Sequence, residues 1–195
     1  MKRLFDVISS IIVLCIGLPF FTLIAITIAV DSKGGVFFKQ QRIGRYKRTF
    51  NLYKFRTMKT GAEKSGQLTI GGKDNRITKI GYMLRKYKID EFPQLINVIK
   101  GDMSIVGPRP EVPKYVCLYT QQQLNVLKVR PGLTDYASLM YFKEDELLGK
   151  AENPEKTYIE KIMPDKLALN MDYINDKKPL KDFIIILKTL RKIIN

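Results

Sequence analysis

The sequence predicts an α+β protein that is mostly helical, in which a re-entrant membrane helix (residues 1–31) precedes a compact domain (residues 32–195). Three observations predict this fold. Residues 7–30 are 24 uncharged positions in succession, which at about 1.5 Å per residue can enter a bilayer as a helix. Two short segments between residues 36 and 58 alternate like the strands of a small β-hairpin. Apolar residues recur at helical spacing through most of the remainder, ending in the pattern of an interfacial amphipathic helix.

The composition is that of a globular protein with a strong positive charge. The 195 residues fit one domain, or one domain with an appendage, and 45% of them are apolar. The formal net charge of +15 predicts an anionic partner: nucleic acid, anionic lipid or a phosphorylated substrate.

Histidine is absent, and the only cysteines are Cys15 and Cys117. Two cysteines cannot build a disulfide framework or a zinc cluster. The absence of histidine excludes Ser-His-Asp hydrolases, helical zinc proteases and any imidazole base. Acid–base or nucleophilic chemistry would therefore fall to carboxylates, lysines, tyrosines or a hard metal ion. Mg²⁺ held by carboxylate oxygens is the natural candidate.

The N-terminal apolar run admits three interpretations. Its length and the lack of a convincing small-x-small cleavage site argue against a secretory signal. A single span would place one basic flank, either Lys2 and Arg3 or the cations after residue 31, on the outer side, against the positive-inside tendency. Pro19 can break the helix near its middle. We therefore favour a re-entrant hairpin, which enters and leaves by one face, over a proline-kinked span.

Residues 32–62 carry nine Lys or Arg and no Asp or Glu. The segments VFFKQQRIG and RTFNLYKFRTM predict two strands joined near Gly44 and Arg45. Most of these cations would face solvent or anionic headgroups, at about 1 kcal/mol for each cation near such a surface. Lys54, Arg56 or both are candidates to bind a phosphate.

Residues 60–75 are rich in glycine and polar side chains, which predicts a loop or lid. A helix over residues 77–87 is expected next, with Ile80 and Leu84 on its inner face. It places Arg85 five residues before an acidic pair. There the arginine is either an exposed cation or a phosphate ligand.

The acidic pair, Asp90 and Glu91, lies near the start of the segment KIDEFPQLINVIKGDMSIVGPRPE. A short helix is expected after the pair, because apolar residues follow at helical spacing and Lys100-Gly101 is typical of a helix end. Proline is tolerated only in the first turn of a helix. Pro93 therefore predicts that Asp90 lies at or near the N-cap.

Such a helix start has chemical consequences for the pair. Both carboxylates could converge on one atom, and uncapped N–H groups would keep Asp90 ionised, as a nucleophile must be. The same end would favour an incoming phosphate. The simpler interpretation is that Asp90 only caps the helix, and from the pair alone this interpretation is the stronger one.

The C-terminal half is expected to be mainly helical. Residues 113–127 indicate one or two short helices, and Arg130-Pro131-Gly132 indicates a sharp turn into LTDYASLMYF, which we expect to be loop or strand. The tail from Asn153 is expected to be helical, broken by Pro164 and restarted at Pro179. The last helix is amphipathic and basic, so it would lie at a membrane interface or pack as an ordinary terminal helix.

Together these segments resemble the bacterial sugar transferase family, in its small monotopic form of phosphoglycosyl transferase. The resemblance rests on the apolar hairpin, YKFRTM, the Asp-Glu pair, NVIKGDMSIVGPRPE and RPGLT, in this order over nearly the whole chain. Ordered blocks of this length favour a catalytic role for the pair over capping. The chain departs from the family pattern at Leu18, where Ser often precedes the proline. It departs again at Asp135-Tyr136, where many relatives have Gly-Trp.

The resemblance implies an enzyme on the cytoplasmic face of the bacterial inner membrane, with residues 32–195 as its cytoplasmic catalytic domain and anionic phospholipid around it. Such enzymes transfer a sugar-1-phosphate from a UDP-sugar to polyprenyl (undecaprenyl) phosphate with release of UMP, the first membrane step of surface glycan or exopolysaccharide synthesis. The resemblance implies Asp90 as nucleophile, Glu91 as its partner, and Mg²⁺ as cofactor near Asp90. With the candidates above, the residues expected to bind substrate phosphate are Arg85, Arg109, Lys54, Arg56 and Arg130.

The chemistry of the residues agrees with this implication. An aspartate that attacks the β-phosphorus forms an acyl phosphate, which polyprenyl phosphate then cleaves, while Mg²⁺ and arginine neutralise the diphosphate. A function of another class is a membrane-tethered nucleic-acid-binding protein, supported by the net charge and by the aromatics among the cations of YKRTFNLYKFR. The sequence contains no helix-turn-helix, zinc-finger or RNA-binding signature, so we expect no nucleic-acid partner. A non-catalytic membrane scaffold is a third function.

Overall fold

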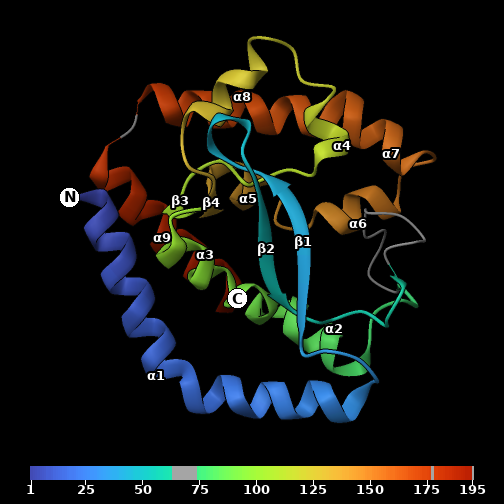
Figure 1. The fold of residues 1–195 in the computed structure, drawn as a ribbon. Helices are drawn as coiled ribbons and strands as arrows, with labels where there is room; N and C mark the ends of the chain where they lie inside the picture. Colours follow the sequence, from blue (N-terminus) through green and yellow to red (C-terminus); the bar gives the residue numbers. More distant parts are fainter. Residues whose placement is uncertain (63–73, 177, 195) are drawn as a thin grey trace.

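A long bent helix borders a body of short helices and small sheets in the computed structural model, which describes residues 1–62, 74–176 and 178–194 (Figure 1). Most of the loop expected over residues 60–75 lies outside the described residues. The described helices are α1 (Lys2–Asp31), α2 (Lys79–Lys86), α3 (Gln94–Lys100), α4 (Pro113–Val116), α5 (Tyr136–Met140), α6 (Glu144–Gly149), α7 (Pro154–Thr157), α8 (Met163–Asn175) and α9 (Pro179–Ile194). The described 3-10 turns are η1 (Arg45–Lys47), η3 (Ile89–Glu91) and η4 (Gln123–Lys128), and η5 (Tyr158–Ile162) is a π turn. The described strands are β1 (Phe37–Ile43), β2 (Thr49–Phe55), β3 (Ser104–Val106) and β4 (Gly132–Thr134).

Helix α1 continues through Pro19 and bends (Figure 1). Proline removes one hydrogen bond from a helix interior and crowds the preceding turn, which kinks the helix. The Thr22 hydroxyl donates to the Leu18 carbonyl at 2.9 Å, beside the proline. Among the described helices, α1 is the one long and apolar enough to cross a membrane, and only 11% of its most apolar window is buried. Its apolar surface therefore lacks a protein partner along most of its length.

The N-terminal end of α1 is bound to the body by its charged first turn. Lys2 Nζ donates to Asp182 Oδ2 on α9 at 2.5 Å and to the Val106 carbonyl on β3 at 2.8 Å. Arg3 donates to the Val98 carbonyl near the C-terminal end of α3 at 2.5 Å. The two cations that resemble a membrane flank in the sequence therefore hydrogen-bond to the rest of the protein.

The C-terminal end of α1 is held by Arg56, whose side chain lies in the interior at 7% exposure. Its guanidinium donates to the carbonyls of Ile28 at 3.1 Å, Ser32 at 2.6 Å and Lys33 at 2.6 Å. The last carbonyls of a helix have no intrahelical hydrogen-bond donors. At the end of α1, the Arg56 guanidinium is such a donor. Both ends of α1 are therefore fastened to the same body.

Strands β1 and β2 form the predicted antiparallel hairpin, in which Phe37 pairs with Phe55 and Ile43 with Thr49. Phe55 also packs in a buried cluster with Ile28 of α1 and Leu84 of α2. The hairpin thus packs against both α1 and α2. Leu52 packs separately on the α3 side of the hairpin.

Strands β3 and β4 form a parallel pair that brings two of the sequence motifs together. Ser104 pairs with Gly132, and Val106 with Thr134. A Cβ on Gly132 would lie 2.1 Å from the backbone nitrogen of Gly107, so this close approach requires glycine. The pair fixes the segment that contains VGPRP against RPGLT.

Several elements differ from the sequence prediction. Helix α3 begins at Gln94 with Pro93 as its N-cap, so Asp90 is not the cap residue but lies in the preceding turn η3. The end of α3 is as expected, with Gly101 at a left-handed φ of 94°. The segment LTDYASLMYF forms β4 and then α5, because Asp135 caps a helix there by accepting from Ser138 N.

The helical tail also differs in one respect. Pro164 does not break it, because the chain passes from α7 through the π turn η5 directly into α8, where Pro164 occupies the first turn. Pro179 begins the last helix, α9, as expected. Ile185 of α9 is fully buried, whereas large apolar side chains on its outer face are exposed: Leu180, Phe183, Leu187, Leu190 and Ile194.

Candidate active site

Asp90 and Glu91 lie side by side in η3, between α2 and α3. Lys88 adopts a left-handed backbone conformation with φ 53° and turns the chain from α2 into η3. Asp90 is 4% exposed and Glu91 is 8% exposed, so both carboxyl groups are nearly enclosed by protein. Buried carboxyl groups need hydrogen bonds or cations, and the two residues meet this need differently.

Asp90 has one carboxyl oxygen without a hydrogen-bond partner. Oδ1 is buried, and none of the described residues donates to it. Burial raises the pKa of Asp90, against the opposing charges of Lys54 and Arg85. The uncapped N–H groups that were expected to keep Asp90 ionised are not donors to Oδ1, because Asp90 lies in η3 and none of the described residues donates to that oxygen.

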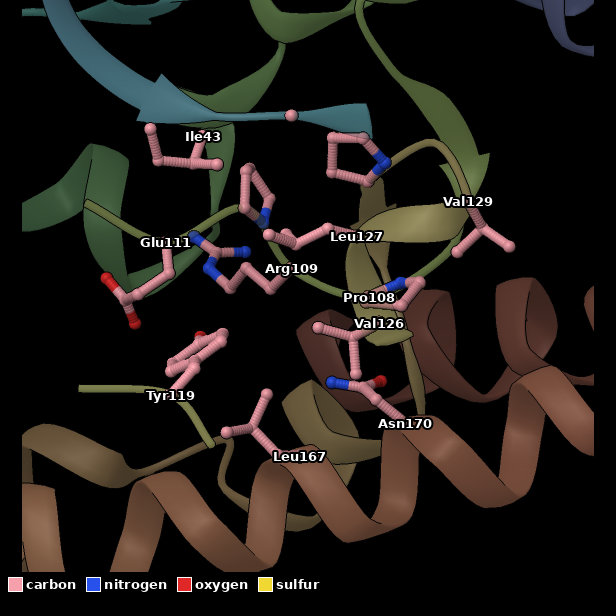
Figure 2. Close-up of a pocket in the computed structure, with 13 residues that line it drawn as sticks. Ile43, Pro108, Arg109, Glu111, Tyr119, Val126, Leu127, Val129, Leu167 and Asn170 are labelled. Atoms are coloured by element: carbon pink, nitrogen blue, oxygen red, sulfur yellow. The ribbon is translucent and has the colours of Figure 1, made fainter. Parts of the chain in front are cut away.

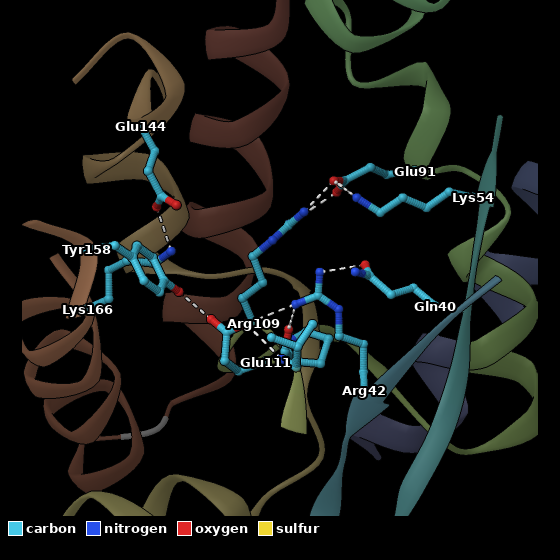
Figure 3. Close-up of polar contacts among 11 residues, drawn as sticks. Gln40, Arg42, Lys54, Glu91, Arg109, Glu111, Glu144, Tyr158 and Lys166 are labelled. Carbon is cyan, nitrogen blue, oxygen red and sulfur yellow. Dashed lines mark hydrogen bonds and ion pairs between the residues drawn. The ribbon is translucent and has the colours of Figure 1, made fainter. Parts of the chain in front are cut away.

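Glu91 is fully paired. Lys54 Nζ donates to Oε1 at 2.9 Å, and Arg109 donates to Oε2 through Nη1 at 3.1 Å and to Oε1 through Nη2 (Figure 3). Burial alone would raise the pKa of Glu91. The charges of Arg109 and Lys54 outweigh it and hold the pKa well below its usual value. Glu91 is thus an ionised anchor for two cations.

Arg109 is positioned by a buried carboxylate that the sequence analysis did not identify. Asp135 is completely buried. Its Oδ2 accepts the Arg109 backbone N–H at 2.9 Å, and its Oδ1 accepts Ser138 N at 2.5 Å. One side chain therefore links the loop at residues 108–110, the Pro-Arg-Pro loop, to the start of α5. The signal that could have revealed it is an aspartate, a preferred N-cap residue, directly before residues 136–140.

A second network supports the same loop from β1. Arg42 Nη1 donates to Glu111 Oε1 at 3.1 Å and to the Pro110 carbonyl at 3.0 Å, while its Nη2 donates to Gln40 (Figure 3). The Tyr158 hydroxyl donates to the other oxygen of Glu111. The loop is therefore held between the hairpin and η5.

Arg85 lies near Asp90, as the sequence predicts. Its Nε donates to Thr57 Oγ1 at 2.9 Å, and its positive charge lowers the pKa of Asp90. Burial lowers the pKa of Arg85 itself. Thr57 is a supporting residue without a signal in the sequence, since the contact joins the end of the hairpin to α2.

Two of the five expected phosphate ligands have other contacts. The described hydrogen bonds of Arg56 go to the end of α1. Arg130 Nε donates to the Gly101 carbonyl at 3.0 Å, at the end of α3. The structure thus brings Lys54, Arg85 and Arg109 to the acidic pair, whereas the described bonds of Arg56 and Arg130 are to helix ends.

A small cavity is lined by 13 residues, among them Arg109, Tyr119 and Asn170 (Figure 2). Its volume is about 20 Å³, which is enough for roughly one water molecule. Asn170 Oδ1 is buried and accepts no hydrogen bond from the described residues. The cavity is thus too small for a nucleotide sugar.

A metal ion would have few protein ligands here. The described residues contain no group of three or more His, Cys, Asp or Glu side chains that could hold an ion. The unpaired Oδ1 of Asp90 is a hard oxygen ligand, while Lys54 and Arg109 occupy both oxygens of Glu91. Mg²⁺ commonly binds one or two carboxylates and completes its shell with water and substrate phosphates. The residues therefore fit Mg²⁺ held mainly by Asp90 and a diphosphate.

Comparison with known proteins identifies a family and several relatives of the chain. The model of the bacterial sugar transferase family matches residues 1–195. An uncharacterized sugar transferase, EpsL of Bacillus subtilis, is 43% identical over 141 residues, which are 71% of this chain and 68% of that protein. The exopolysaccharide production protein PSS of Rhizobium leguminosarum bv. phaseoli is 34% identical over 201 residues, covering 97% of this chain and 93% of that protein.

A third relative has a more specific name. The UDP-N-acetylgalactosamine-undecaprenyl-phosphate N-acetylgalactosaminephosphotransferase of Aeromonas hydrophila is 33% identical over 196 residues. The alignment covers 99% of this chain but 43% of that protein, so the chain spans less than half of its length. The match of the family model over the whole chain, with these relatives, shows that the protein belongs to the bacterial sugar transferase family.

Proposed function

We propose that the protein transfers a sugar-1-phosphate from a UDP-sugar to polyprenyl (undecaprenyl) phosphate, with release of UMP, in the synthesis of an exopolysaccharide or other surface glycan. The observation that carries this proposal is the buried, unpaired Oδ1 of Asp90 beside the fully paired Glu91. The names of the relatives support it, since one is a UDP-sugar phosphotransferase and another an exopolysaccharide production protein.

Asp90 is the nucleophile in this proposal. Its carboxylate attacks the β-phosphorus of the UDP-sugar, a P–O bond forms to Oδ1 or Oδ2, and the P–O bond to UMP breaks. An oxygen of polyprenyl phosphate then attacks the same phosphorus and releases the Asp90 carboxylate. Only P–O bonds break, so the anomeric carbon of the sugar keeps its configuration.

The neighbouring cations stabilise the charge that develops on the diphosphate. Arg109 is 33% exposed in its side chain, so N–H groups beyond those bound to Glu91 can face a substrate. Arg85 lies near Asp90 and would bind a second phosphate oxygen. Glu91 holds Lys54 and Arg109 in place, and its lowered pKa makes it unsuited to donate a proton at neutral pH.

Asp90 would hold Mg²⁺ together with the donor diphosphate. When bound, the ion would supply neutralisation of phosphate charge and orientation of the leaving group. Oδ1 of Asp90, to which none of the described residues donates, is the oxygen that would bind the ion. Glu91 contributes no free oxygen to this site.

The protein would work at the cytoplasmic face of the bacterial inner membrane, with α1 re-entrant and anionic phospholipid around it. Supporting this topology, Lys2 binds α9 at one end of α1 and Arg56 binds the carbonyls at the other end. A helix fastened to one body at both ends enters and leaves by the side on which that body lies. The exposed apolar face of α9 would lie in the same interface.

The test is UMP release from a panel of UDP-sugars, measured in detergent with polyprenyl phosphate and Mg²⁺. We expect one or a few donors to release UMP, and Asp90→Asn to abolish release. Asp172→Asn, the same exchange at an exposed position on α8, is the control. Release that survives in Asp90→Asn contradicts the assignment of the nucleophile, and release from no donor contradicts the function.

A further inference from the structure

A second cationic cluster adjoins the acidic pair at Phe142. The Lys88 ammonium lies 5.1 Å from the centre of the Phe142 ring, and the Lys192 ammonium lies 5.4 Å from it. An aromatic ring attracts each cation, but two like charges on one ring repel each other. Neither lysine has a carboxylate partner among the described ion pairs. The cluster is thus complementary to a doubly charged anion.

Three segments far apart in the sequence build this cluster. Lys88 comes from the turn before η3, Phe142 follows α5, and Lys192 lies near the end of α9. Lys192 also donates to the Leu139 carbonyl at 2.7 Å, which fixes its side chain over α5. An ammonium group has three donors, so two remain for a ligand.

The cluster lies next to the turn that carries the acidic pair. Lys88 is two residues from Asp90, and its charge lowers the pKa of both Asp90 and Glu91. Lys192 lies near the C-terminal end of α9, on the side of the helix that faces Phe142 and Leu139. A phosphate bound by Lys88 and Lys192 would therefore lie next to the turn η3.

We propose that Lys88, Phe142 and Lys192 form the site that receives the phosphate of the lipid acceptor. This inference rests on the proposed function. The ligand is a phosphate monoester on an apolar chain, whose charge two lysines balance. From this site its oxygen attacks the phosphorus of the phosphosugar bound to Asp90. The new P–O bond forms as the bond to Asp90 breaks, and the carboxylate is regenerated.

The two half-reactions allow a direct test, because the donor step needs no acceptor. Lys192→Gln removes one charge from the cluster at the residue that lies on α9, and Arg191→Gln removes the same charge from the neighbouring position on α9. We expect Lys192→Gln to raise the KM for polyprenyl phosphate roughly tenfold, as for loss of a charge-assisted hydrogen bond. Exchange of labelled UMP into the UDP-sugar, without acceptor, should stay at the wild-type rate. Lys192→Arg should restore the KM, and Arg191→Gln should leave it unchanged.

Other results would overturn the inference. An unchanged acceptor KM in Lys192→Gln, with UMP exchange intact, rejects the acceptor site and leaves the proposed function standing. Equal effects of Lys192→Gln and Arg191→Gln on KM, with weaker binding of both to phosphatidylglycerol vesicles, identify a general contact with lipid headgroups instead. The absence of UMP exchange in the wild-type protein rejects the proposed function and this inference with it.

Discussion

At the scale of residues, the site depends on two adjacent carboxylates with opposite surroundings. Glu91 is held ionised by Lys54 and Arg109, while Asp90 is buried with an unpaired oxygen. Environments that push the pKa values of neighbouring groups apart are typical of sites where the two groups have different tasks. Glu91 organises the cations, and Asp90 is the residue that reacts in the proposed function.

The first prediction concerns the titration of this pair. In the absence of substrate, the pKa of Asp90 should lie above its ordinary value of 3.8, and that of Glu91 well below 4.5. Glu91 therefore stabilises the fold above pH 4.5, and this contribution is lost as the pH falls towards its lowered pKa. Asp90 acts in the opposite sense, because stability falls as the pH rises through its raised pKa.

Carboxyl ¹³C NMR of the wild-type protein and Asp90→Asn would measure both pKa values. Since ionised Asp90 is buried, Asp90→Asn should also unfold at a higher temperature than the wild type at neutral pH. A lower unfolding temperature for Asp90→Asn, or a pKa of Asp90 below 3.8, would contradict the assignment of Asp90 as a buried carboxylate without donors to Oδ1.

The second prediction concerns Asp135, which accepts the backbone N–H of Arg109. Asparagine still caps α5 but has one acceptor oxygen in place of two, so Asp135→Asn should loosen the Pro-Arg-Pro loop. We expect the KM for the UDP-sugar to rise about tenfold, in line with one unsatisfied buried donor, with a smaller effect on unfolding temperature. Asn153→Asp, an exchange at the N-cap of α7, is the control. A drop in unfolding temperature with an unchanged KM would make Asp135 purely structural.

The order of the sequence motifs along the chain was enough to predict part of this site. The Asp-Glu pair, Lys54, Arg85 and Arg109 were predicted and lie together. Arg56 and Arg130 were expected there as well, but a sequence does not show whether a guanidinium faces substrate or the carbonyls of a helix end.

At the scale of elements, arginines at helix ends hold the long helix α1 and the turn η3 against the same body. Arg3 binds the C-terminal end of α3, the helix that follows the acidic pair. Arg56 binds the C-terminal end of α1, and the next residue, Thr57, accepts a hydrogen bond from Arg85. Cations near C-terminal helix ends are favoured by the helix dipole and by the unpaired carbonyls. The position of α1 is thereby coupled to the site.

The third prediction follows from the burial of Arg56. Arg56→Met keeps an unbranched apolar stem and removes the guanidinium donor from the carbonyls of Ile28, Ser32 and Lys33. Unfolding in detergent by urea should show a loss of about 2–4 kcal/mol, the range for breaking a buried hydrogen-bonded charge. Arg48→Met, at an exposed hairpin position, should change stability by less than about 0.5 kcal/mol. Equal, small losses in both variants would mean that Arg56 does not hold α1.

Helices and strands were predicted correctly where the apolar residues recur with a clear period. They were predicted incorrectly where a single cap residue or turn determines where a helix begins or continues. Alternation predicted β1 and β2, and glycine predicted the end of α3. Helix α5 was missed because Asp135 starts a helix directly after β4. The break expected at Pro164 did not occur, because a π turn places that proline at a tolerated position.

At the scale of the whole molecule, the two ends of α1 meet one body, and the apolar surfaces of α1 and α9 are left exposed. The sequence predicted a long apolar helix and a basic amphipathic one. It could not show that Lys2 and Arg3 bind the body, because charge near an apolar run does not distinguish a lipid flank from an internal contact.

The fourth prediction concerns this topology. In a Cys15→Ser background, an impermeant maleimide should label a cysteine added before Met1 only from the face on which Cys117, exposed on the body, is labelled. Inverted vesicles and intact spheroplasts provide the two faces. Labelling of the two cysteines from opposite faces would mean that α1 spans the bilayer.

The most direct test of the central claim is intact-mass measurement of the protein after incubation with its UDP-sugar and Mg²⁺ in the absence of polyprenyl phosphate. We predict a mass increase equal to one sugar phosphate, located at Asp90 by peptide sequencing, absent from Asp90→Asn and discharged when polyprenyl phosphate is added. Normal turnover without any such adduct, or an adduct at another residue, would contradict the account.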